Sequence, residues 1–120
     1  METLISRRGG MTVELFRAET DQTDRSLVVR LIGAFDYLAF EQVDTLLTDA
    51  QLGGKRTVVV DLRGLTSIDS TGIKALLHAH LRASVLVGHF RLIRGPDHVQ
   101  RVFELIGVDK RFDFVDPDQP

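Results

Sequence analysis

Hydrophobic and polar positions along this chain follow two different periods, and the changes of period predict its elements. Apolar residues alternate with polar ones over residues 12–18, which is typical of a half-buried strand. The apolar run 26–32 predicts a second strand, antiparallel to the first because the polar turn 19–25 between them is short. Residues 57–62 form a nearly continuous apolar run, as expected of a central strand covered on both faces.

Apolar residues at helical spacing predict three helices. These are residues 40–50, ended by Gly53 and Gly54; residues 70–84; and residues 96–106, ended by Gly107. Two shorter strands are expected at residues 89–93 and 112–115. The resulting order, ββαβαβαβ, predicts an α/β domain with a mixed sheet, in which the first strand is antiparallel, the remainder is largely parallel and the helices pack against the sheet.

Composition limits the classes of function. The chain has 120 residues, of which 43% are hydrophobic and 27% charged, and this favours one globular domain. The net charge of −2 gives no general attraction to nucleic acid or to an anionic membrane, and no apolar run approaches the roughly 18 residues that span a bilayer. The absence of cysteine excludes disulfides and suits a cytoplasmic protein.

The two ends of the chain are expected to lie outside the domain, which we place at residues 12–116. Residues 1–11 lack the apolar stretch of a signal peptide and are interpreted as a flexible N-terminal leader, with Met11 as a conceivable alternative start. Residues 117–120 are interpreted as a polar C-terminal tail.

One serine stands between the predicted central strand and the second helix. The loop there closes with Asp69, Ser70, Thr71 and Gly72. A hydroxyl at that point is the expected N-cap, because its oxygen can accept a hydrogen bond from a free first-turn N–H. The same place suits a phosphate, because a helix N-terminus offers free donors and partial positive charge. Ser70 is therefore either a cap or a phosphorylation switch.

The segment 61–77, DLRGLTSIDSTGIKALL, resembles the signature of the STAS domain, in particular that of bacterial anti-sigma-factor antagonists. The segments 29–36 and 94–108 resemble two further blocks of that family in the same order. The resemblance implies a STAS-like fold and phosphorylation of Ser70. By the same resemblance, the unphosphorylated protein binds a cytoplasmic anti-sigma factor that is itself a serine kinase and so releases a sigma factor. A separate phosphatase would reset the switch.

The resemblance also implies which residues border the docking surface. They are Asp36, Asp69, Thr71 and Gly72, flanked by Ile73 and Lys74 at the start of the second helix. Each has a simpler structural explanation: the two aspartates are typical of caps and turns, and the glycine of close backbone approach. Thr71 is a conceivable second phosphorylation site. Asp61 is interpreted as structural, pairing with loop amides.

The sequence gives little support for an enzymatic function. No histidine lies near Ser70 in the sequence to act as the base of a nucleophile triad. His78 and His80 are two residues apart, so they diverge on a helix and cannot bind the same metal ion. We therefore expect no catalytic residue, metal or cofactor. The alternative function is a structural STAS subunit that binds the ATPase of a phospholipid-transport ABC system.

Two apolar features depart from the pattern of the family. The run Val85, Leu86, Val87 either continues the second helix into the core, which is the simpler interpretation, or forms an exposed patch for a partner or a homodimer. Phe35 is interpreted as an apolar residue on the docking face.

Overall fold

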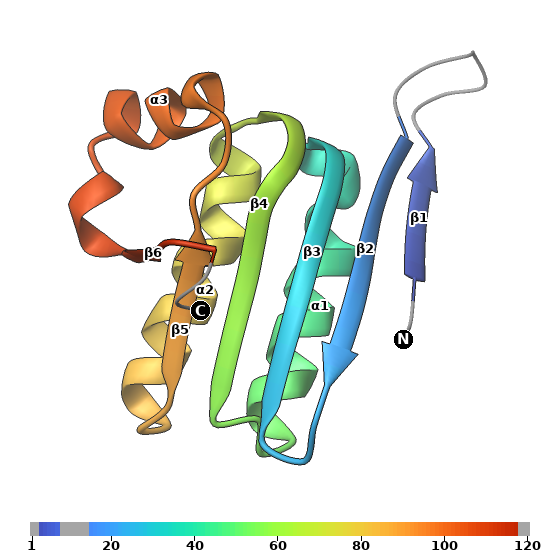
Figure 1. The fold of residues 1–120 in the computed structure, drawn as a ribbon, viewed down its shortest axis with the longest axis vertical. Coiled ribbons are helices and arrows are strands. Elements are labelled where there is room, and N and C mark those ends of the chain that lie inside the picture. Colours follow the sequence, from blue (N-terminus) through green and yellow to red (C-terminus); the bar gives the residue numbers. More distant parts are fainter. Residues whose placement is uncertain (1–2, 8–14, 118–120) are drawn as a thin grey trace.

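The structure is a computed structural model that describes residues 3–7 and 15–117, and its centre is one mixed sheet (Figure 1). Six strands follow one another across the sheet in chain order: β1 (Thr3–Arg7), β2 (Leu15–Gln22), β3 (Ser26–Phe35), β4 (Thr57–Ile68), β5 (His89–Ile93) and β6 (Asp113–Val115). The helices are α1 (Tyr37–Leu52), α2 (Ser70–Val85) and α3 (Asp97–Ile106), with the short 3₁₀ helix η1 at Asp109–Arg111.

Strand directions confirm the predicted α/β class. β1, β2 and β3 pair antiparallel, whereas β3, β4, β5 and β6 pair parallel. Each parallel connection runs through a helix, which returns the chain to the same end of the sheet. As a result, α1 and α2 begin at the same end of the sheet and cover one of its faces (Figure 1).

The structure differs from the sequence-based expectation in four strands. β3 continues to Phe35, beyond the expected end at Ile32. Part of the expected leader, Thr3–Arg7, forms β1 and pairs with β2. β2 continues to Gln22, through residues expected to form a turn. β4 continues to Ile68, through the expected loop. The remaining leader residues, 1–2 and 8–11, which include Met11, lie outside the described residues, as do residues 12–14 of the first predicted strand and residues 118–120 of the predicted tail.

β4 is long because β3 pairs with it as far as Phe35 opposite Ile68. Two register shifts, opposite Arg30 to Ile32 and opposite Gly33 to Ala34 of β3, each insert one extra residue in β4 and keep the strands paired over this distance. Gly64 lies at the first shift, and a Cβ there would come 2.9 Å from the Leu31 carbonyl oxygen. The extension carries the end of β4 up to the point where α2 begins.

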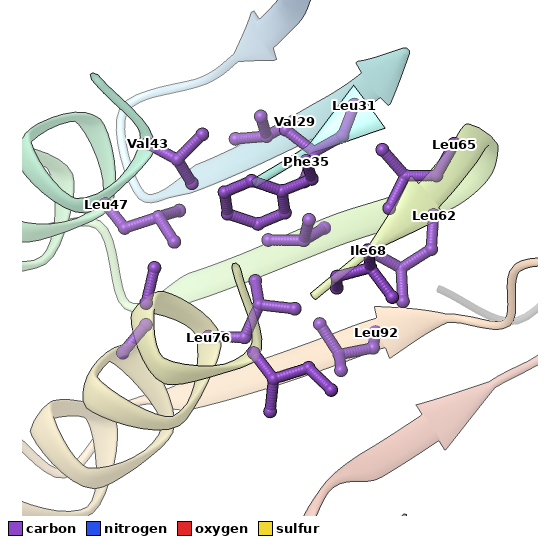
Figure 2. Packing of buried hydrophobic residues seen from close by; sticks show 14 of the residues in the cluster. Val29, Leu31, Phe35, Val43, Leu47, Leu62, Leu65, Ile68, Leu76 and Leu92 are labelled. Carbon is purple, nitrogen blue, oxygen red and sulfur yellow. The ribbon is translucent and has the colours of Figure 1, made fainter. Parts of the chain in front are cut away.

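The hydrophobic core lies between the sheet and the helices (Figure 2). Its strand residues include Val29, Leu31 and Phe35 of β3 and Leu62, Leu65 and Ile68 of β4, and its helix residues include Val43 and Leu47 of α1 and Leu76 of α2. Val59 and Asp61 alternate with the core residues of β4 and are also buried, which confirms that this strand is covered on both faces. None of the described helices is both long and apolar enough to cross a membrane.

Asp61 forms an ion pair with Arg63 on the face of the sheet opposite the helices. Its carboxylate accepts hydrogen bonds from Arg63 Nη2 at 2.7 Å and from the Arg63 backbone N–H at 3.0 Å. Burial alone acts to raise the pKa of Asp61, but the bonds from Arg63 and the charges of Arg63 and Arg30 outweigh it and hold that pKa below its usual value. The structural role expected for Asp61 is confirmed.

We expect this pair to make stability depend on acid pH. Because the pKa of Asp61 is lower in the folded than in the unfolded chain, its contribution is complete above the unfolded value of about 4 and is lost as pH falls through the folded value. Arg63→Gln should lower the free energy of unfolding at neutral pH and flatten its decline below about pH 4. Urea unfolding from pH 2 to pH 7 measures this; an unchanged acid profile would contradict it.

Candidate functional site

The N-termini of α1 and α2 lie side by side where β3 and β4 end (Figure 1). Each helix follows an aspartate that comes directly after its strand, Asp36 after β3 and Asp69 after β4. The two turns are joined, because the Asp69 backbone N–H donates to the Phe35 carbonyl oxygen at 3.2 Å. The C-terminal ends of parallel strands are the usual place for binding sites in α/β sheets, since loops and helix N-termini converge there.

Asp69 is the N-cap of α2. Its Oδ1 accepts hydrogen bonds from the Thr71 N–H at 2.9 Å and the Gly72 N–H at 3.0 Å, and its carbonyl oxygen accepts from the Ile73 N–H at 3.1 Å. The interpretation of Ser70 as the cap is therefore wrong. Ser70 is the first residue of the helix, it is exposed, and its hydroxyl bonds to no residue that the structure describes.

Asp36 has the same position before α1. Its Oδ1 accepts a hydrogen bond from the Leu38 N–H at 3.0 Å, and its side chain is buried. The sequence offered a structural explanation for Asp36, a turn residue at the end of a strand. In the structure Asp36 is a helix cap. Asp36 shapes the surface by fixing the start of α1 rather than by presenting a free carboxylate.

Gly72 allows the two helix starts to approach each other. A Cβ at this residue would lie 2.7 Å from the Phe35 carbonyl oxygen and 3.0 Å from both the Phe35 ring and Ile68 Cγ1. No side chain fits there without moving backbone atoms. Gly72 and Ile73 are buried, Thr71 is half-buried, and of the predicted flank only Lys74 is exposed.

Phe35 is not on the surface: its ring is 0% exposed and belongs to the core, so its interpretation as a docking residue is wrong. The exposed apolar side chains at this end are Tyr37, 67% exposed, and Leu38, which begin α1. Sequence reasoning missed both because it started the first helix at Phe40. Asp36, a good capping residue directly before them, was the signal that could have placed them in the first turn.

Asp69→Ala should lower the free energy of unfolding by about 0.5–2 kcal/mol, because two N–H groups of α2 lose their acceptor. Ser70→Ala is the matched control and should leave stability unchanged, because the Ser70 hydroxyl caps nothing in the described structure. Urea denaturation of the two variants beside the unchanged chain measures both effects. Equal losses in the two variants would contradict this assignment of the cap.

A second surface lies at the opposite end of the same two helices. Its members are exposed apolar side chains from the ends of α1 and α2, and we call them the C-terminal apolar patch: Leu52, Leu81, Val85, Leu86 and Val87. The patch contradicts the simpler interpretation, in which Val85 to Val87 continue a helix into the core. α2 ends there because Val87 adopts a left-handed conformation, φ 56°, and the Gly88 N–H bonds back to the Ala83 carbonyl at 2.8 Å.

A groove runs along this patch. It is lined by Leu52 and the outer residues of α2, with Arg82 and His78 among them. The Arg82 Nε donates to Gln51 Oε1 at 2.9 Å, and Gln51 Nε2 donates to the Ala79 carbonyl at 2.8 Å, so the groove rests on a hydrogen-bonded link between the two helices. No group of three or more histidine, aspartate or glutamate side chains within residues 3–7 and 15–117 is placed to hold a metal ion.

Comparisons with known proteins give consistent results. A protein-family model described as "Mlab, STAS domain" matches residues 18–116. An "Anti-sigma F factor antagonist" of Lysinibacillus sphaericus is 28% identical over 87 residues, which cover 72% of this chain and 74% of that protein.

Among solved structures, the anti-sigma factor antagonist SpoIIAA in its unphosphorylated form superposes with a TM-score of 0.74 at 22% identity, covering 85% of this chain and 90% of that one. The Bacillus protein SpoIIAA in its phosphorylated form gives a TM-score of 0.68 at 21% identity, covering 85% and 94%. At these identities the structural matches establish a shared fold.

Proposed function

The chain belongs to the STAS domain family, and we propose on that basis that it is an anti-sigma-factor antagonist, a binding protein and not an enzyme. In this proposal the unphosphorylated form binds a cytoplasmic anti-sigma factor that has serine kinase activity, and a sigma factor is released. Phosphorylation of Ser70 ends the binding, and a phosphatase restores it. The name of the Lysinibacillus relative supports the activity, and SpoIIAA, solved in both forms, is a relative that carries a phosphate.

The observation that carries the proposal is the state of Ser70. The hydroxyl is exposed and unbonded within the described residues, while Asp69 caps the helix. A serine required by the fold would be bonded or buried, and Ser70 is neither. Its hydroxyl is therefore accessible to a kinase and can be modified without loss of a capping bond.

The surface around Ser70 suits a docking site for another protein. Tyr37 and Leu38 add exposed apolar area at the neighbouring helix start, and aromatic side chains are enriched where binding energy concentrates. Lys74 adds a positive charge one turn along α2 from Ser70. A phosphate adds about −1.5 to −2 charges and three acceptor oxygens, so the partner surface would face a bulky anion in place of a small hydroxyl.

A pull-down from lysate of the source organism tests the proposal, with the unchanged chain, Ser70→Ala and Ser70→Asp as baits and mass spectrometry to identify what each holds. We expect a serine-kinase-like anti-sigma factor on the first two baits and its loss from Ser70→Asp. Such a protein held equally by all three baits would contradict the switch.

The C-terminal apolar patch favours a second candidate, a structural subunit that binds the ATPase of a phospholipid-transport ABC system. The patch is exposed, with Val85 80% and Val87 74% accessible, and permanent interfaces are more apolar than switchable ones. Val85→Glu should then release an ABC ATPase that Ser70→Asp retains; an ATPase unaffected by Val85→Glu would argue against it.

A further inference from the structure

We propose that Lys74 is the counter-ion of phosphorylated Ser70, and that the amides following Ser70 in α2 are not the binding site of the phosphate. The inference rests on the proposed phosphorylation of Ser70. It assigns Lys74 two successive roles: a free cation on the docking surface before phosphorylation, and a partner of the phosphate afterwards.

The amides that follow Ser70 at the start of α2 already have acceptors. The Thr71 and Gly72 N–H groups both donate to the Asp69 carboxylate, and the Ile73 N–H donates to the Asp69 carbonyl. A helix N-terminus attracts a phosphate through free N–H donors and partial positive charge. Here the carboxylate and carbonyl of Asp69 occupy these donors, and the carboxylate supplies a negative charge of its own, so a phosphate on Ser70 would be repelled where the sequence alone predicts attraction.

Two neighbouring titratable side chains, one on each side of α2, do not compensate for this repulsion. From α1, the neighbouring cap Asp36 adds a second carboxylate. From α3, His98 has its Nε2 bonded to the Thr66 carbonyl at 2.6 Å, which directs that nitrogen to the end of β4. A phosphate at Ser70 therefore needs a mobile cation that can reach it from the exposed side of α2.

Lys74 has the required position and freedom. It follows Ser70 by four residues on α2, and residues at this spacing lie on one helix face with Cβ atoms about 5–6 Å apart. Both side chains are exposed, and Lys74 makes no ion pair or hydrogen bond with any residue of the described ranges. An anion placed four residues before a lysine is also the more favourable order along a helix.

Phosphorus-31 NMR of the chain carrying genetically encoded phosphoserine at position 70 tests the inference. A phosphoserine loses its second proton with a pKa near 6, and a nearby cation lowers that value because it favours the dianion. Lys74→Gln should raise the phosphate pKa by roughly 0.3 unit at low ionic strength, and by less at high salt. Asp69→Asn, which keeps a capping oxygen but removes a negative charge, should lower it.

Arg56→Gln is the matched control, because Arg56 is an exposed cation directly before β4, at the opposite end of the strand. It should leave the phosphate titration unchanged. Titration curves of Lys74→Gln that coincide with those of the unchanged chain, or a shift equal to that of Arg56→Gln, would overturn the inference. The pull-down decides the proposed function separately, because phosphate titration requires neither the kinase nor the partner.

Discussion

Ser70→Asp is expected to weaken binding to the anti-sigma factor by roughly 30- to 4000-fold, whereas Ser70→Ala should bind like the unchanged chain. The estimate follows from placing an unpaired charge in a desolvated interface, which costs about 2–5 kcal/mol. The serine is exposed and caps nothing within the described residues, so neither variant should lose stability through the cap. Isothermal titration calorimetry with the purified partner measures the two affinities.

Ser84→Asp provides the control for this comparison. Ser84 is an exposed hydroxyl residue near the other end of the same helix, so the substitution makes the same chemical change far from the docking surface. It should bind within a few-fold of the unchanged chain. A loss of affinity as large as that of Ser70→Asp would show that added negative charge, rather than the position of Ser70, controls binding.

Phe35→Ala is expected to lower the free energy of unfolding by about 3–5 kcal/mol, the largest stability effect that we predict. The ring is fully buried, its centroid lies 5.6 Å from that of Phe16, and the backbone of Gly72 packs directly against it. Its removal would leave a cavity beneath the starts of α1 and α2. Urea unfolding of the variant measures the loss.

Tyr37→Ala separates this core role from docking. Tyr37 lies two residues away and is mostly exposed, so its truncation should change stability little but weaken partner binding. A stable Phe35→Ala variant, or a Tyr37→Ala variant that is strongly destabilised, would contradict the assignment of the two rings to core and surface.

Much of the fold could be predicted because its signals are local. β5 and α3 lie where the sequence placed them, since an apolar run and the pair Pro96 and Gly107 mark their ends directly. The length of β4 could not be predicted in the same way. Residues 63–68 are rich in polar and turn-forming residues, and they are extended because β3 pairs with them, a long-range contact with no local signature.

The local structure at the start of α2 could be predicted only in part. Two adjacent residues, Asp69 and Ser70, are both good caps, and the choice between them depends on where the first helical turn closes. Which of the two rings is buried depends on where the first turn of α1 begins. In the structure this turn leaves Phe35 in the core and places Tyr37 outward. Val85 to Val87 are apolar and are interpreted from the sequence as core residues, yet the turn at Val87 ends the helix and leaves them on the surface.

One measurement tests the central claim most directly. The anti-sigma factor captured by the unchanged chain is purified, mixed with that chain and ATP, and followed by size-exclusion chromatography and tandem mass spectrometry. We predict that a single phosphate appears on Ser70, that the complex separates as it accumulates, and that Ser70→Ala remains bound and unmodified. A complex that persists with Ser70 phosphorylated, or a phosphate transferred elsewhere while Ser70 stays unmodified, would contradict the account.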